Sequence, residues 1–207
     1  MACGKAPVAR HILLTGPPGI GKTTLVKNTC EALQKLGIAV QGFYTEEVRT
    51  GGHRGKRMGF DVVTLHGERG HLARIRDEPT QTTGKREYKV GQYSVEIHAF
   101  ETTALPTLKL SVDQGGNLPV VVIDEIGKME LFSNSFKSAV TSVLNRKDTT
   151  VLATIPIPKG RPIPFIEDIR SRPDATVMTV SVGNRDYLLQ EVLAAVKNSH
   201  GARKTCS

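Results

Sequence analysis

The residues best suited to chemistry lie in one glycine-rich segment, residues 16–23, whose letters GPPGIGKT match G-x-x-x-x-G-K-[ST] at every position. In this pattern the glycines bring backbone N–H groups close to a β-phosphate, the lysine bridges the β- and γ-phosphates, and the last hydroxyl ligates Mg²⁺. The segment therefore predicts a P-loop for a triphosphate, with Lys22 in a catalytic role and Thr23 as a metal ligand. The predicted phosphate-binding residues are Gly16, Pro17, Pro18, Gly19, Ile20, Gly21, Lys22, Thr23 and Thr24.

A second group of candidates is the acidic pair Asp124 and Glu125, which directly follows the apolar run of residues 120–123. Such a run predicts a buried parallel strand, and ligands bind beyond the carboxyl ends of parallel strands. Asp124 is expected to contact Mg²⁺-bound water, and Glu125 is expected to polarise an attacking water near the γ-phosphate. Two solvated carboxylates at the start of a loop are the alternative interpretation.

The elements that must position these groups follow from hydrophobic periodicity. Residues 11–15 form an apolar run of strand length, and from Thr24 apolar residues recur near the 3.6-residue period of a helix, which Gly37 ends. A strand, a glycine loop and a helix in this order point backbone N–H groups and the helix dipole at one place. Further strands are predicted at residues 38–44, 60–65, 72–75, 92–97, 151–155 and 176–181. Helices are predicted at residues 99–110, with a bend at Pro106, and at 132–143, 164–172 and 186–197.

Composition bounds the organisation of the chain. Its 207 residues suit a single domain (1–207), in which residues 49–97 form a β-rich insert with an antiparallel hairpin patch and residues 198–207 form a flexible tail. Three cysteines far apart in sequence fit a reducing, cytoplasmic setting. The longest apolar run, residues 118–123, is too short to span a bilayer. We expect a monomer with no membrane segment.

The charge of +8 admits a nucleic-acid partner as an alternative. Residues 49–91 hold ten Lys or Arg against five Asp or Glu, and such a basic segment can contact nucleic acid. A multiply charged nucleotide also needs positive surroundings, and few aromatic residues are interleaved for base stacking. Nucleic-acid binding is therefore the less favoured interpretation.

Several other residues could serve the same site, and each has an ordinary surface role as its alternative. Glu46 and Glu47 could reach the outer shell of the magnesium, and Thr154 could sense the γ-phosphate. Cations after the fifth core strand could close over the triphosphate, and residues 184–185 could cradle the base. These secondary candidates are Glu46, Glu47, Lys128, Glu130, Thr154, Lys159, Arg161, Arg170, Arg172, Asn184 and Arg185. The six histidines share no metal-ligand spacing.

Five separated motifs together resemble the thermophilic-type nucleoside-triphosphatases. They are residues 16–23, 42–49, 59–61, 90–93 and 124–130, and the resemblance runs from about residue 9 to residue 198. It implies an α/β P-loop fold of the RecA/kinase-like type, and Mg²⁺-dependent hydrolysis of ATP, GTP, CTP and UTP with loose base preference. It also implies a second nucleotide-binding segment made of Val120, Val121, Val122, Ile123, Asp124, Glu125, Ile126 and Gly127.

Three hypotheses follow for the function of the chain. The leading one is an enzyme that hydrolyses the γ-phosphate slowly, because no arginine can be assigned as a finger. The second is a nucleoside or nucleotide kinase whose basic insert holds the phosphate acceptor. The third is a nucleotide-dependent switch that binds RNA or DNA, whose affinity would fall steeply with salt.

Overall fold

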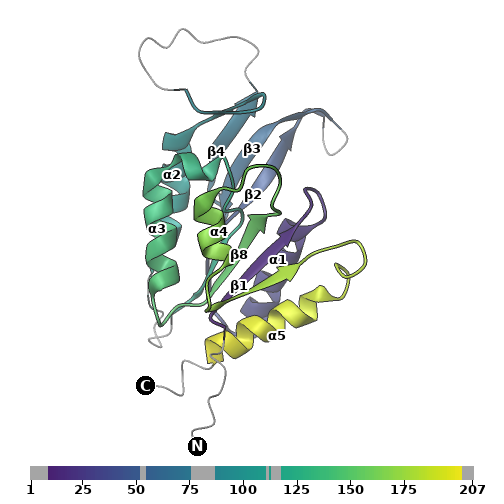
Figure 1. Ribbon diagram of the computed structural model, residues 1–207, viewed down its shortest axis with the longest axis vertical. Coiled ribbons are helices and arrows are strands. Elements are labelled where there is room, and N and C mark those ends of the chain that lie inside the picture. The colour runs from purple at the N-terminus through teal and green to yellow at the C-terminus, as the bar shows by residue number, and fades with distance from the viewer. Residues whose placement is uncertain (1–8, 52–54, 76–86, 111, 113–117, 202–207) are drawn as a thin grey trace, which may run out of the picture.

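The chain forms a central β-sheet covered by helices on both faces, as a computed structural model shows (Figure 1). The structure describes residues 9–51, 55–75, 87–110, 112 and 118–201. The strands are β1 (His11–Gly16), β2 (Val40–Arg49), β3 (Arg57–Thr64), β4 (Arg69–Ile75), β5 (Lys89–Val90), β6 (Tyr93–Val95), β7 (Val120–Ile123), β8 (Val151–Pro156) and β9 (Ala175–Thr179). The helices are α1 (Lys22–Lys35), α2 (Ile97–Ala104), α3 (Asn134–Asn145), α4 (Pro164–Arg170) and α5 (Leu188–Gly201), with short 3-10 helices η1 (Leu105–Leu108) and η2 (Glu130–Phe132).

The sheet has a parallel half and an antiparallel half. Its strand order is β5-β6-β4-β3-β2-β7-β8-β1-β9. Strands β2, β7, β8, β1 and β9 are parallel to their neighbours in this half, whereas β2–β3, β3–β4, β4–β6 and β5–β6 pair antiparallel. The order confirms the predicted α/β class with a parallel core and added hairpin strands. It also places β8 between the strand that leads to the P-loop and the strand that ends at Asp124.

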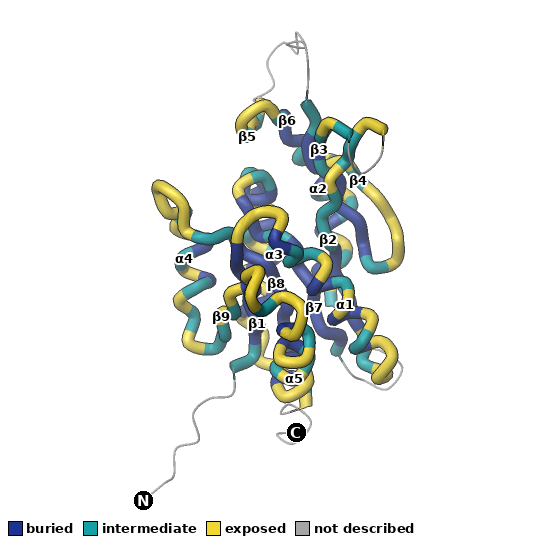
Figure 2. The backbone as a smooth tube through the Cα atoms, turned by 90° about the vertical axis from the view of Figure 1, so that its right-hand side faces the viewer, coloured by how far each residue is buried: buried dark blue, intermediate teal, exposed yellow. Residues whose placement is uncertain are grey.

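Two hydrophobic layers hold the sheet between its helices. Along β1, Leu13 packs into the layer under α2, α3 and α4, while Ile12 and Leu14 pack into the layer under α1 and α5. The alternation follows from the two-residue repeat of a strand, which sends successive side chains to opposite faces. Figure 2 shows the strands of the parallel core buried between exposed turns and helix surfaces. Because the core strands are buried on both faces, their apolar runs are continuous.

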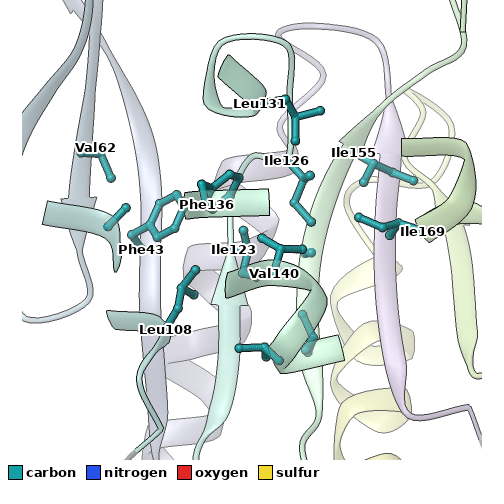
Figure 3. Close-up of a cluster of buried hydrophobic side chains, with 14 of the residues drawn as sticks. Phe43, Val62, Leu108, Ile123, Ile126, Leu131, Phe136, Val140, Ile155 and Ile169 are labelled. Carbon is teal, nitrogen blue, oxygen red and sulfur yellow. The ribbon is translucent and has the colours of Figure 1, made fainter. Parts of the chain in front are cut away.

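The layer below α3 is built around three phenylalanines. Phe136 on α3 lies 5.2 Å from Phe100 and 6.0 Å from Phe43, measured between ring centroids. Figure 3 shows Phe43 and Phe136 facing each other, with Ile123 and Val140 beside them. The Ser133 hydroxyl caps α3 by accepting from the Phe136 N–H at 2.9 Å. This layer supports the end of β7, where the acidic pair begins.

Several predicted boundaries are corrected by the structure. Strand β2 continues to Arg49 because it pairs with β3, and β6 ends at Val95 because Ile97 already begins α2. The predicted helix 99–110 becomes η1 from Leu105, where Pro106 removes a backbone donor. Residues 76–86, most of the predicted loop 77–87, and the predicted linker 115–117 lie outside the described residues.

The expected tail from residue 198 begins later than the sequence indicates. Helix α5 runs to Gly201, and Ser199 is buried with its hydroxyl donating to the Arg10 carbonyl at 2.7 Å. Thr150 and Ser199 also share a hydrogen bond of 3.0 Å. The last turn of α5 is therefore held against the start of β1 and β8, and residues 202–207 lie outside the described part.

Candidate functional site

The P-loop joins the end of β1 to the start of α1, and its glycines meet specific steric demands. A Cβ at Gly16 would lie 2.5 Å from the Val180 carbonyl oxygen, so no larger residue fits there. Gly19 and Gly21 have φ values of 73° and 107°, a region that L side chains rarely adopt. The loop therefore leaves the sheet and enters the helix in a tight curve, as the sequence predicted.

Lys22 lies across this curve. Its ammonium Nζ donates to the Gly16 carbonyl at 2.9 Å and to the Pro17 carbonyl at 3.1 Å. The cation is therefore held over the mouth of the loop by two backbone acceptors, in the place where a P-loop binds phosphate oxygens.

Asp124 is buried at the end of β7 with one of its oxygens used and the other free. Thr154 on β8 donates its hydroxyl to Asp124 Oδ1 at 2.6 Å, while Oδ2 has no hydrogen-bond partner among the described residues. Burial raises the pKa of Asp124, and the hydroxyls of Thr154 and Thr23 and the charge of Lys22 oppose that rise. The influence of Thr23 and Lys22 places the P-loop beside Asp124, although β8 separates β1 from β7 in the sheet.

Glu125 lies beside this pair at the rim of a cavity of about 590 Å³. Burial raises the pKa of Glu125 first, the negative charge of Asp124 adds to the rise, and Lys22 opposes it. A carboxylate with a raised pKa is a stronger base than an exposed one. The structure thus brings Lys22, Asp124 and Glu125 into one electrostatic group.

Glu130, a secondary candidate in the sequence with an ordinary surface role as its alternative, is a buried carboxyl group. Its Oε2 accepts from the Gly127 N–H at 3.1 Å, and a Cβ on Gly127 would lie 2.9 Å from Glu130 Oε2 and 3.0 Å from Glu125 Oε1. Burial raises the pKa of Glu130 to about 8, with further contributions from the charges of Glu125 and Asp124. Gly127 therefore leaves room for both carboxyl groups. Met129 and Leu131 flank Glu130 in sequence, and this apolar setting was the available signal of burial.

The raised pKa of Glu130 predicts a pH-dependent loss of stability that Glu130→Gln removes. Between the unfolded pKa of 4.5 and the folded pKa of about 8, the unfolded chain loses the proton and the folded chain keeps it, so stability falls as pH rises. The largest slope from one group is about 1.4 kcal/mol per pH unit. Urea unfolding from pH 5 to pH 8 should show a smaller decline for the variant than for the wild type. Parallel declines would contradict the predicted pKa.

The two acidic candidates after the second strand are engaged elsewhere. Glu46 accepts from Lys27 at 2.6 Å and from Arg69 at 2.5 Å, and Glu47 pairs with Arg49 and Arg57. These ion pairs tie α1 and the hairpin strands together. These contacts correspond to the ordinary surface role that was the alternative for Glu46 and Glu47.

The arginines of the described part of the insert are neutralised by the same acidic residues. The buried Asp61 forms ion pairs with Arg69, at 2.9 Å, and with Arg74. Glu47 forms ion pairs with Arg49 and Arg57. Guanidinium groups that already bind carboxylates offer less to a phosphate backbone. This arrangement weakens the case for residues 49–97 as a nucleic-acid surface.

Three further candidates, Arg170, Arg172 and Asn184, form hydrogen bonds or ion pairs outside the group of Lys22, Asp124 and Glu125. Arg172 pairs with Asp174 at 2.9 Å beside the start of β1, at the sheet edge opposite the P-loop. Arg170 donates to the Pro156 carbonyl at 2.5 Å, and Asn184 bonds the Ser181 N–H and the Thr179 carbonyl within its own loop.

Arg185 instead lines a second cavity of about 370 Å³ together with Gly19, Gly21 and Thr24. It is therefore near the P-loop, as expected for a residue that could cradle a base. Lys128, Lys159 and Arg161 line the larger cavity beside Glu125.

The described ranges contain neither a membrane-spanning helix nor a cluster of metal-binding side chains. No helix there is long and apolar enough to cross a bilayer. In the same ranges no group of three or more His, Cys, Asp or Glu side chains is arranged to hold a metal ion.

Comparison with known proteins gives a consistent set of relatives. A family model described as NTPase matches residues 11–193. The cancer-related nucleoside-triphosphatase of Homo sapiens is 51% identical over 93% of this chain and 99% of its own length. The nucleoside-triphosphatase THEP1 of Thermotoga maritima is 38% identical with the same coverage of both chains.

Solved structures agree with the sequence comparison. The solution structure of the human cancer-related nucleoside triphosphatase superposes with a TM-score of 0.79, covering 92% of this chain and 99% of that one. The crystal structure of THEP1 from Aquifex aeolicus, 34% identical, gives a TM-score of 0.71 and covers 90% and 99%. The match extends over nearly the whole chain in sequence and in fold, and the chain therefore belongs to the NTPase family.

Proposed function

We propose that this protein hydrolyses nucleoside triphosphates to the diphosphate and phosphate. The observation that carries the proposal is the grouping of Lys22, Asp124 and Glu125 at the carboxyl edge of the sheet, where Lys22 acts on the pKa of both carboxyl groups and Asp124 acts on that of Glu125. A cation, a buried acid with a free oxygen and a basic carboxylate are the groups that phosphoryl transfer to water requires. The printed names of the relatives, which are nucleoside-triphosphatases, support the same reaction.

The residues would act in distinct ways. Backbone N–H groups of the P-loop bind the phosphates, and Lys22 turns from the Gly16 and Pro17 carbonyls to the β- and γ-phosphates. Glu125 accepts a proton from the attacking water as the bond between the γ-phosphorus and the β–γ bridging oxygen breaks. Glu125 is half-buried beside the cavity, and this partial burial keeps its pKa raised.

The residues present fit a Mg²⁺ ion. Mg²⁺ prefers hard oxygen ligands. Asp124 Oδ2 is buried and has no hydrogen-bond partner among the described residues. The Thr23 hydroxyl lies close enough to Asp124 to lower its pKa. We propose that Thr23 and Asp124 hold it, where it would neutralise charge on the phosphates.

We propose broad base specificity and slow turnover. The second cavity beside the P-loop is lined by four polar side chains, Thr24, Asn28, Arg185 and Asp186, together with apolar and glycine residues, and we infer that these few polar groups do not select one base edge over another. Arg170 donates to a backbone carbonyl and Arg172 lies at the opposite sheet edge, so we assign neither as a finger. An arginine finger adds about 10³ to 10⁵ to the rate in related chemistry.

The proposal is tested by measuring products from ATP, GTP, CTP and UTP separately. We expect free phosphate and the diphosphate from all four, with no monophosphate, and no reaction when a chelator removes Mg²⁺. Adding nucleosides as acceptors should not raise the rate. A strong acceptor-dependent rate would favour a kinase, and absence of phosphate release from every triphosphate would contradict hydrolysis.

Thr154 is expected to act through Asp124, and Thr154→Val tests this role. The variant keeps the shape of the side chain but removes the 2.6 Å hydrogen bond that orients Oδ1. Loss of a group that orients a metal ligand typically costs about 10- to 100-fold in metal affinity or activity. The Mg²⁺ concentration for half-maximal hydrolysis should rise by a factor in this range, while Thr102→Val, at an exposed helix position, should leave it unchanged. An unchanged Mg²⁺ requirement in T154V would refute the role.

A further inference from the structure

The larger cavity has a composition that the hydrolytic reaction does not explain. It is bounded by Glu125 and Lys128 on one side and by the segment that joins β8 to α4 on the other (Figure 1). Its volume of about 590 Å³ falls within the range of small-molecule sites, about 300 to 1,000 Å³. Its lining includes no residue of the P-loop. The cavity therefore adjoins the proposed general base Glu125 but does not include the P-loop.

The charged groups of the cavity favour an anion. Lys128, Lys159 and Arg161 are exposed and have no ion pair with any described residue, whereas the carboxylate of Glu167 is 3.3 Å from Arg170. These three cations and the unpaired carboxylate of Glu125 all line the cavity. Their charges sum to a surplus of two positive charges. A surplus of two charges matches a phosphate monoester dianion.

Arg161 is distinguished from the other arginines of the described ranges. Each of the others, from Arg10 to Arg185, has an acidic partner within 4 Å, and Arg161 has none. A guanidinium group binds phosphate oxygens through two parallel N–H donors. The guanidinium group of Arg161, which has no acidic partner among the described residues, can therefore bind a phosphate directly through its N–H donors.

The rest of the lining is apolar and stiff. Four prolines and three isoleucines form most of the remaining wall. Apolar walls with a few placed polar groups are the usual composition of a site that holds an organic molecule. Inorganic phosphate would leave these walls in contact with water, whereas a phosphate monoester with a nucleoside-sized body would cover them.

We propose that this cavity is a second ligand site, which binds a small phosphate monoester with an apolar or heterocyclic body, of the nucleoside monophosphate class. Arg161 and Lys159 bind its phosphate, and the proline and isoleucine walls hold its body. The occupant lies beside Glu125 and takes the space of water there, so that binding slows hydrolysis. This consequence for the rate rests on the proposed function, but the binding itself does not.

Binding is tested first by titration calorimetry with the full chain, saturated with Mg²⁺ and a non-hydrolysable ATP analogue so that the P-loop is filled. Adenosine 5′-monophosphate is the probe, and we expect one saturable site with a Kd below about 1 mM. Adenosine and inorganic phosphate should each bind at least tenfold more weakly. No saturable binding of the monophosphate, or equal binding of either fragment, would overturn the proposal.

Arg161→Ala identifies the site. It should weaken monophosphate binding at least tenfold, because it removes a charge-assisted hydrogen-bonded pair. Arg146→Ala is the matched control, since Arg146 is also exposed but pairs with Asp148 away from the cavity. Equal affinity of the wild type and R161A would overturn the proposal.

The rate of phosphate release separates this proposal from an arginine finger. At saturating ATP the monophosphate should slow release by the wild type, and R161A should lose this inhibition while keeping the wild-type rate without the probe. A large fall in the rate of R161A without the monophosphate would mean that Arg161 serves the triphosphate itself, and the proposal would be wrong. If the wild type releases no phosphate at all, the proposed hydrolysis fails, but the calorimetric result still decides the second site.

Discussion

Glu125→Gln is expected to lower kcat for triphosphate hydrolysis by about 10² to 10⁴, the usual contribution of a general base. Nucleotide affinity should change little, because Lys22 and the P-loop backbone remain in place. The amide has the size of the carboxylate but cannot accept the proton of the attacking water. Steady-state phosphate release and fluorescent-nucleotide binding would measure the two quantities separately.

The matched control for this variant is Glu68→Gln, which changes an exposed carboxylate in the turn between β3 and β4. Its kcat and affinity should equal those of the wild type. If E125Q hydrolyses at the wild-type rate, Glu125 is not the base. If E125Q loses nucleotide binding as well, the effect lies in binding rather than in proton transfer.

Phe136→Ala is expected to lower the free energy of unfolding by about 3 to 5 kcal/mol. Phe136 is completely buried and contacts the rings of Phe43 and Phe100, so truncation leaves a cavity that helix α3 cannot readily fill. Urea unfolding followed by circular dichroism should show a lower midpoint with an unchanged slope.

Tyr187→Ala provides the control for the core prediction. Tyr187 is an aromatic residue with 69% of its surface exposed, and its replacement should change the stability by about 0.5 kcal/mol or less. A loss below about 1 kcal/mol in F136A would mean that the three-ring cluster repacks, which contradicts the close packing seen around α3.

The continuous apolar runs and the glycine positions of the chain correctly predicted the elements around the site. The apolar run 120–123 is strand β7, the run 11–15 is most of β1, and Gly37 follows the end of α1. These assignments succeeded because burial on both faces produces a continuous apolar run, and because positive φ angles are open mainly to glycine. The roles of the P-loop residues and of Glu125 in binding and hydrolysis stay predictions.

Apart from element boundaries, the side-chain roles that the local sequence could not decide concern partners far away in sequence. The sequence places Glu46 and Glu47 after a strand ending at residue 44, but they lie within β2 and form ion pairs with Lys27 of α1 and with arginines of the hairpin strands. Arg172 lies only two residues after Arg170 and yet is at the opposite edge of the sheet, because α4 ends between the two and the chain turns back into β9. Charge and spacing along one segment carry no information about which other segment packs against it.

The local sequence by itself determined the phosphate-binding turn, since the shape of that turn depends on glycine at positions where side chains would clash or be strained. It also determined which carboxylates follow a buried strand. Only the tertiary structure decided the strand order that puts Thr154 of β8 against Asp124, the burial that raises the pKa of Glu130, and the cavity in which Arg161 is left without an acidic partner. The physical reason is that hydrogen-bond pairing, desolvation and cavity shape are set by segments that meet only after the sheet has formed.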